Sequence, residues 1–286
     1  MLARPPKILS RNTVKPTAVA ACLENKRASG SWITGWGLGR LSYLVLMAAF
    51  AAGAPLALGQ PIWHAENLAL LHGDGYTVVP EEQTTLTFEH VSGWTWGDLF
   101  GFVDVTHFHH AGVETAVYSE WNPRVSLSWL SGQQLTAGPI KDVLIATTFE
   151  VGDGDVETLL IGPGTSWDLP GFDFFNLNLQ YAIPRYGDSH GWQVTAAWAW
   201  RSPVAGSTFV FEGYTDWIPA SRGGYHRNLH FNPQLKMDLG PWLNTEPEHL
   251  YVGVEYDFWS HKFGIEDSNA FPTRQNTASI MIQWKF

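Results

Sequence analysis

The chain has 286 residues, of which 45% are hydrophobic and only 15% are charged, whereas soluble domains usually carry about 25% charged residues. Its 15 tryptophans favour surfaces where one end of the side chain is apolar and the other is wet. The net charge of −10 argues against binding to nucleic-acid phosphates, and the single cysteine, Cys22, excludes disulfides and cysteine-ligated zinc elsewhere in the chain. This composition is typical of a barrel whose outer wall meets lipid.

The first 59 residues have the pattern of an export signal. Seven basic residues and one acid, Glu24, precede or flank the apolar run Leu41–Ala52, which has signal-peptide length and is short for a membrane span. Small residues occupy the −3 and −1 positions before Gln60. We therefore expect residues 1–59 to be an N-terminal extension with a cleaved signal peptide, the alternative being one anchoring helix. Cleavage leaves 26 acids (27 less Glu24) and 10 bases (17 less seven) over residues 60–286, a net charge of −16.

The next stretch, residues 60–81, is expected to be an N-terminal periplasmic segment, and residues 82–286 are expected to form the barrel. From residue 82 onward the chain is divided by Gly, Pro, Asn and Asp into segments of about ten residues in which apolar and polar side chains alternate. Successive strand side chains point to opposite faces, so each segment predicts a strand with one apolar face. The clearest segments are Gly97–Phe108, Ser119–Trp129, Phe175–Tyr181, Trp192–Arg201, Thr208–Ile218, His230–Leu239, Leu250–Trp259 and Ala278–Phe286. Weaker candidates are Lys141–Val151 and Glu157–Ile161.

Two features favour a membrane barrel over a soluble sandwich, which would also alternate. Trp, Phe and Tyr are frequent near the segment ends, as in an aromatic girdle. The last strand ends in a C-terminal Phe286, which we expect the barrel-assembly machinery to recognise. The fold class predicted is all-β: a transmembrane antiparallel up-and-down β-barrel in a Gram-negative outer membrane, with about 12 strands, or 10 as the alternative.

The polar faces of these strands collect ionisable and aromatic side chains, which are expected to line the lumen because charges cannot easily face hydrocarbon. A planar base stacks on an aromatic ring for roughly 1–3 kcal/mol. Carboxylates can accept hydrogen bonds from sugar hydroxyls, and an acidic lumen disfavours anions. The sequence therefore predicts passive diffusion of nucleosides or similar small neutral solutes. The residues predicted to line and bind are Phe100, Phe102, Phe108, Tyr214, Asp98, Asp104, Glu120, Arg124, Glu212 and Asp216. The alternative is a structural or receptor barrel whose lumen is blocked by paired charges and aromatic filler.

No catalytic or cofactor motif stands out. H-E-x-x-H is absent, and the single G-x-S-x-G match, Gly187–Gly191, is not followed by the helical pattern that a nucleophile elbow needs, so neither an enzyme nor a cofactor is expected. A lipid hydrolase is a third hypothesis, but it needs a Ser-His pair on the lipid-facing wall, where apolar residues dominate. His107 and His109 fall on one strand face and could bind a metal. Such a cluster more often lies at a strand end or in a loop, so no metal site is predicted.

Several motifs also carry a family resemblance. They are Gly97–Asp104 (GDLFGFVD), Pro123–Leu127, Pro170–Asn178, Phe231–Leu235, Tyr251–Tyr256 and the closing Phe286. In this order they resemble the nucleoside-specific outer-membrane channel family of the Tsx/OmpK type, closer to the OmpK branch. The resemblance covers about residues 82–286. It implies a twelve-stranded monomeric barrel for diffusive nucleoside uptake, which often doubles as a phage or colicin receptor.

Overall fold

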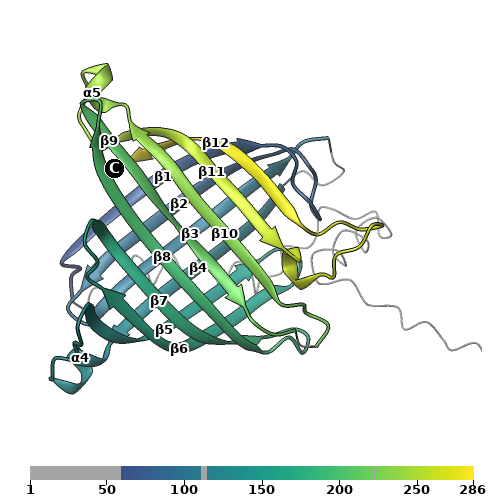
Figure 1. Ribbon diagram of the computed structural model, residues 1–286, viewed down its shortest axis with the longest axis horizontal. Coiled ribbons are helices and arrows are strands. Elements are labelled where there is room, and N and C mark those ends of the chain that lie inside the picture. The colour runs from purple at the N-terminus through teal and green to yellow at the C-terminus, as the bar shows by residue number, and fades with distance from the viewer. Residues whose placement is uncertain (1–58, 111–114, 222) are drawn as a thin grey trace, which may run out of the picture.

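The computed structural model describes residues 59–110, 115–221 and 223–286, and these form an antiparallel barrel of twelve strands (Figure 1). The strands are β1 (Trp63–Gly73), β2 (Gln83–Trp94), β3 (Gly97–Phe108), β4 (Thr115–Ser126), β5 (Ile140–Gly152), β6 (Val156–Trp167), β7 (Phe172–Pro184), β8 (Gly191–Val204), β9 (Ser207–Ile218), β10 (Asn228–Asp238), β11 (Leu250–Ser260) and β12 (Gln275–Lys285). The predicted fold class, an all-β antiparallel barrel, is confirmed, with 12 strands rather than the alternative of 10.

Each strand pairs with its sequence neighbours, and β12 returns to pair with β1. The closing register runs from Asn67 opposite Lys285 to Gly73 opposite Ser279. Closure leaves no strand edge unpaired, which a membrane requires because hydrocarbon offers no hydrogen-bond partners to free backbone groups.

The barrel begins earlier than the sequence indicated. Residues 60–81, expected to precede the barrel, contain β1, which is paired along its whole length with β2 and also with β12. The boundary at residue 82 is therefore corrected to Trp63. Ser119–Trp129 also ends sooner as a strand, because β4 stops at Ser126 and a short helix, α4 (Leu127–Ser131), follows. The two weaker candidates are complete strands, β5 and β6.

The outer wall is apolar, and β12 shows why. Ile280, Ile282 and Trp284 are exposed, whereas the residues between them are buried. Such exposed aliphatic side chains would be unfavourable in water and are suited to lipid. Within the described ranges no helix has both the length and the apolar character needed to cross a membrane.

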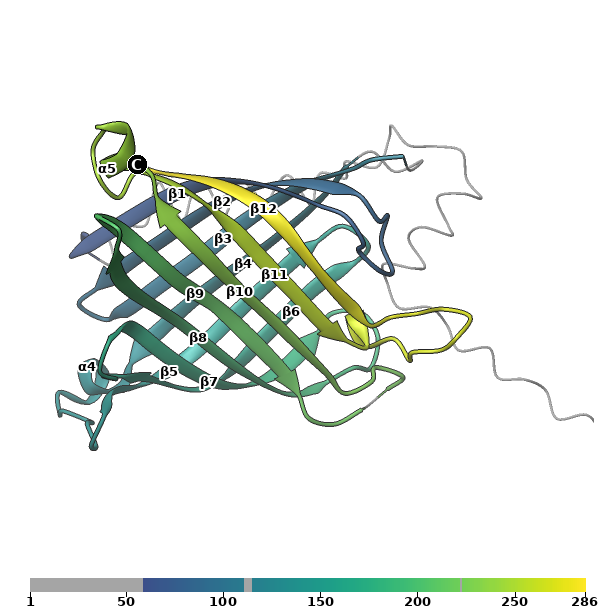
Figure 2. The same ribbon diagram turned by 45° about the horizontal axis from the view of Figure 1, so that its top comes forward.

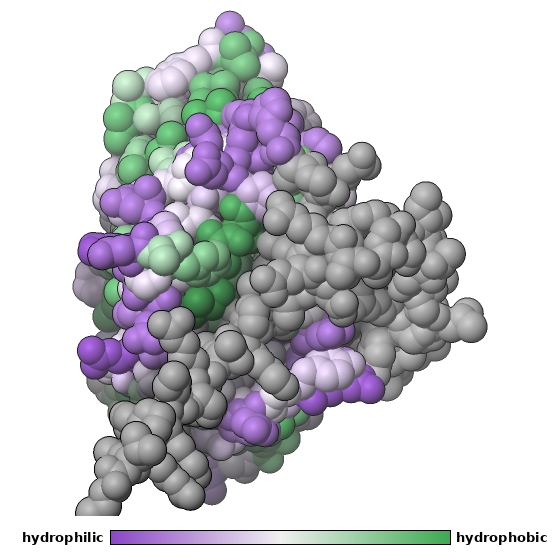
Figure 3. Space-filling view, turned by 90° about the vertical axis from the view of Figure 1, so that its right-hand side faces the viewer, coloured by the Kyte–Doolittle hydropathy of each residue, from purple (hydrophilic) through white to green (hydrophobic). Residues whose placement is uncertain are grey.

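The two ends of the barrel differ. The end that holds the C-terminus carries α4 and a second short helix, α5 (Gly240–Leu243), whereas the connection from β11 to β12 extends from the other end (Figure 2). That connection contains a short 3-10 helix, η1 (Lys262–Gly264). Hydrophilic side chains gather in several groups on this second end (Figure 3). The predicted signal peptide lies in residues 1–58, outside the described residues, apart from its last position.

Candidate functional site

Side-chain contacts identify the inner face of the wall. Lys236 of β10 donates to Gln283 of β12 at 2.8 Å, and Arg124 of β4 donates to Ser166 of β6 at 3.3 Å. In each pair one strand lies between the partners, and side chains can reach across a strand only on the concave side of a barrel. The strand registers then place all ten predicted site residues on this inner face.

Three rings on β3 and β4 form an aromatic row along the inner wall. The ring centroids of Phe100 and Phe102 are 6.0 Å apart, and those of Phe102 and Tyr118 are 5.9 Å apart. Phe100 is 37% exposed, so part of its ring remains open for contact. We call Phe100, Phe102 and Tyr118 the aromatic row.

Two carboxylates border the aromatic row. Glu120 stands opposite Phe102 in the register and accepts a hydrogen bond of 2.7 Å from the Tyr118 hydroxyl. Asp104 stands opposite Tyr118 and accepts one of 2.6 Å from Thr87. Each hydrogen bond fixes the orientation of a carboxylate that retains further acceptor capacity.

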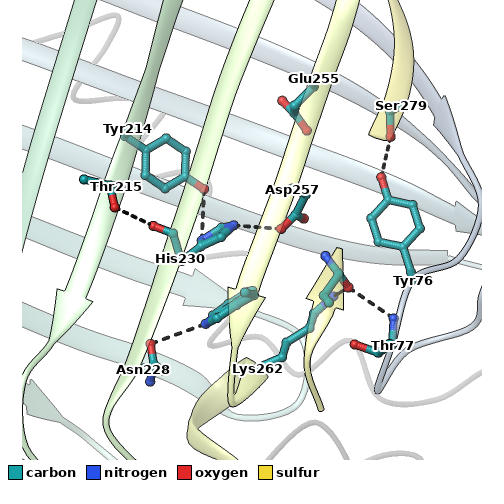
Figure 4. A network of polar contacts seen from close by, with 12 residues as sticks. Tyr76, Thr77, Tyr214, Thr215, Asn228, His230, Glu255, Asp257, Lys262 and Ser279 are labelled. Carbon is teal, nitrogen blue, oxygen red and sulfur yellow. Dashed lines mark hydrogen bonds and ion pairs between the residues drawn. The ribbon is translucent and has the colours of Figure 1, made fainter. Parts of the chain in front are cut away.

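A second group, on β9, β10 and β11, surrounds His230 (Figure 4). The His230 ring stacks on Trp259 at 4.1 Å with an interplanar angle of 8°, and Tyr214 meets it edge-on at 5.2 Å. Its Nε2 lies 3.2 Å from Oδ1 of Asp257. We call Tyr214, His230, Asp257 and Trp259 the His230 cluster.

The aromatic row, on β3 and β4, and the His230 cluster, on β9, β10 and β11, both face the lumen. Asp216 of β9 stands opposite His230 in the register. Asp216 is held by a 2.5 Å hydrogen bond from Thr195. In each group the rings can contact the face of a flat, uncharged ligand, and the carboxylates beside them can accept hydrogen bonds from its hydroxyl groups.

The remaining predicted site residues belong to neither the aromatic row nor the His230 cluster. Arg124 donates to both oxygens of Asp98, at 2.7 and 2.6 Å, and Lys236 forms an ion pair with Glu212. These pairs neutralise charge within the wall. Phe108 is buried at the end of β3. It is six residues from Phe102, about 20 Å along an extended strand, so the structure does not bring it to the aromatic row.

Four members of the two groups were not among the predicted binding residues. Asp257 and Trp259 share the polar parity of the segment Leu250–Trp259, so alternation already places them on the inner face, and the same holds for His230 at the start of His230–Leu239. Tyr118 falls one residue before the segment Ser119–Trp129, and extending that pattern by one residue places it on the inner face.

Lys262 was also missed, because it follows a strand in a turn. Its ammonium donates to Gln275 and lies 5.4 Å from the ring of Tyr76 and 5.2 Å from that of Phe263. Burial lowers the pKa of Lys262 to about 8, against the opposing attraction of Asp257. Burial likewise raises the pKa of the Tyr76 hydroxyl to about 12.

Several known proteins are similar to this chain. Outer membrane protein OmpK of Vibrio parahaemolyticus is 29% identical over 199 residues, 66% of this chain and 73% of that protein. OmpK of V. parahaemolyticus serotype O3:K6 is 24% identical over 204 residues, 66% of this chain and 75% of that protein. A solved KdgM porin matches with a TM-score of 0.44 and 9% identity, over 77% of this chain and 99% of the porin.

The family comparison spans most of the chain. Residues 66–286 match the family model described as "Nucleoside-specific channel-forming protein, Tsx". The match starts within β1 and ends at the last residue, so it covers the barrel almost completely. The chain therefore belongs to the Tsx family of channel-forming proteins, and it is a channel of the outer membrane rather than an enzyme.

Proposed function

We propose that the lumen of this outer-membrane channel binds nucleosides, or neutral solutes of similar size and shape, and lets them diffuse into the periplasm. One observation carries the proposal: the inner wall holds two groups of aromatic rings, the aromatic row and the His230 cluster, each with carboxylates beside it. The family description supports the same substrate class.

The physical chemistry favours a flat, uncharged solute. Stacking of a base on an aromatic side chain contributes roughly 1–3 kcal/mol. Glu120 and Asp104 accept hydrogen bonds from Tyr118 and Thr87, and their remaining lone pairs can accept bonds from ribose hydroxyls. A site of this strength is strong enough to select a solute and weak enough to release it, as passage through a channel requires.

The charge of the inner wall argues against nucleotides. Its acidic side chains include Glu89, Asp104, Glu120, Glu150, Asp216, Glu255 and Asp257. Of its basic side chains, Arg124, Lys236 and Arg201 are already paired with Asp98, Glu212 and Asp173, and Lys285 is outnumbered by these acids. The remaining negative potential repels phosphate groups and leaves neutral nucleosides unaffected.

Replacing Phe100 and Phe102 with alanine tests the stacking role. Removing two rings from the aromatic row should weaken adenosine binding about 10-fold or more, from the stacking energy of one to two contacts. Ion conductance should change little, because ions do not need the rings. Both quantities are measured in planar bilayers, from current and from its block by adenosine.

The matched control is Phe88→Ala on β2. Phe88 is 39% exposed on the opposite face of the wall, where Val103 stands across from it. This variant should bind adenosine as the wild type does. Equal losses of conductance and adenosine binding in the Phe100/Phe102 variant would contradict a stacking role.

A receptor barrel with a blocked lumen, serving a phage or a colicin, is the second candidate. The paired charges Arg124–Asp98 and Lys236–Glu212 favour it, since such pairs can close an inner wall. A barrel of this kind would carry no current in planar bilayers.

A further inference from the structure

Four histidines and a glutamate gather outside the lumen, at the barrel end opposite the C-terminus. They come from the end of β1, the residue before β2, and the end of β3 with the two residues that follow. The group is His72, Glu82, His107, His109 and His110. The register sets His72 opposite Thr84 and Thr84 opposite His107, on the face that alternates with the lumen-facing residues. The cluster therefore lies on the outer rim of the barrel.

Three of these side chains have the geometry of a metal site. Ligand atoms of His72, Glu82 and His109 all lie within 4.8 Å of one another. Nε2 of His72 is 3.8 Å from Oε1 of Glu82, and Nε2 of His110 is 3.3 Å from Oε2 of the same carboxylate. Donors around a tetrahedral zinc ion stand about 3.3 Å apart, given bonds of about 2.0–2.2 Å. Small side-chain rotations would bring the three atoms to that spacing.

The backbone and a hydroxyl already hold the three side chains in place. The His109 amide donates to the Glu82 carbonyl at 2.9 Å, which fixes the β3 end against the β2 start. Thr84 Oγ1 is hydrogen-bonded to His72 Nδ1 at 3.0 Å and to His109 Nε2 at 2.9 Å. Metal-binding histidines usually direct their second ring nitrogen to such a partner. Here the Thr84 contact leaves His72 Nε2 facing the carboxylate.

We propose that His72, Glu82 and His109 bind a divalent transition metal, with Zn²⁺ as the best match. Two imidazoles and one carboxylate are a recognised zinc ligand set, and the fourth position would be filled by water or by His110. Imidazole nitrogens select zinc, copper or nickel, whereas calcium and magnesium require oxygen ligands. The ion would tie the β1–β2 connection to the end of β3.

Zinc binding is measured on the protein extracted from outer membranes in detergent and carrying no polyhistidine tag. Equilibrium dialysis against ZnCl₂ should give one tight equivalent per chain. The double variant His72→Ala/His109→Ala should lose that equivalent. Glu82→Gln, which keeps the side-chain shape, should weaken zinc binding about 10-fold or more. Even the loss of a residue that only hydrogen-bonds to a metal ligand typically lowers metal affinity by that factor.

The chain offers a matched control on the same two strands. His64 and His90 flank Glu66 at the other end of β1 and β2, with Nδ1–Oε1 distances of 3.1 and 2.8 Å. His64→Ala/His90→Ala removes as many imidazoles from a similar setting and should keep the bound zinc. No stoichiometric binding by the wild type, wild-type binding by His72→Ala/His109→Ala, or loss of zinc in the control would each overturn the proposal. If the double variant does not fold, Glu82→Gln decides: unchanged affinity would overturn the proposal.

Discussion

The ammonium group of Lys262 is enclosed by aromatic rings. The rings of Tyr76, Trp259 and Phe263 all lie within 6 Å of Nζ, at 5.4, 5.7 and 5.2 Å. Cation–π contacts of this kind recover part of the cost of burying a charge. Burial outweighs the attraction of Asp257 and lowers the pKa of Lys262 to about 8, because a buried site favours the neutral amine.

Lys262 makes barrel stability depend on pH. Between pH 8 and the ordinary lysine value of 10.5, the unfolded chain binds more protons at this group than the folded chain does, so the free energy of unfolding rises with pH. At 1.36 kcal/mol per unit, the gain from pH 8 to pH 10 is about 2 kcal/mol. Urea unfolding in detergent should show this gain in the wild type.

Lys262→Met keeps the aliphatic stem and removes the titrating group. Between pH 8 and pH 10 the free energy of unfolding of this variant should therefore rise by about 2 kcal/mol less than that of the wild type. The series stops at pH 10 because Tyr76, with its pKa raised to about 12, acts in the opposite direction above that value. Parallel curves for the two proteins would show that Lys262 is not the source of the dependence.

At the scale of the element, each strand has one lipid face and one lumen face, and β10 allows a direct test. Leu235 is 43% exposed on the outer wall. Its neighbour Gln234 faces the lumen, where it donates to Glu255 at 2.9 Å. Leu235→Arg places a charge against hydrocarbon and should lower the free energy of unfolding by about 2–4 kcal/mol.

Gln234→Arg is the matched substitution one residue away. The new cation would stand beside Glu255 and opposite Glu212 in the register, so its cost should stay below about 1 kcal/mol. Both variants are measured by urea unfolding in lipid vesicles. A larger loss for Gln234→Arg than for Leu235→Arg would reverse the assignment of faces.

The strand faces could be read from the sequence because side-chain alternation is a local property. In β12, the outer-face residues Ile280, Ile282 and Trp284 alternate with inner-face residues that are polar except for Met281. The first strand, β1, was missed because it breaks this rule. Its outer face mixes Leu68 and Leu70 with charged and polar residues, and its inner face carries Ala69 and Leu71, which form an apolar cluster with Met281 of β12. That contact depends on closure between strands about 200 residues apart.

For the site, the sequence predicted the face of each residue but not the contacts between residues. Alternation put all ten predicted residues on the inner wall, but it did not indicate which of them meet. Arg124 neutralises Asp98 and Lys236 neutralises Glu212 through contacts between adjacent strands, whose register no local pattern defines. Nor did alternation indicate that Tyr214, His230 and Trp259 pack together, because those contacts join β9, β10 and β11.

At the scale of the whole molecule, the barrel separates two environments. Its outer wall presents aliphatic and aromatic side chains to lipid, and its inner wall presents carboxylates, amides and a few rings. Closure between β1 and β12 completes this separation by leaving no free strand edge. The family match and the outer-membrane relatives agree with a channel of this construction.

The most direct test of nucleoside binding in the lumen is single-channel current of the purified barrel in a planar bilayer. The current is titrated with adenosine and, as control, with a sugar of similar size that lacks an aromatic base. We expect saturable block by adenosine and little block by the sugar, because only the base can stack on the aromatic row. A steady current that neither solute blocks would contradict a nucleoside site and leave a general pore.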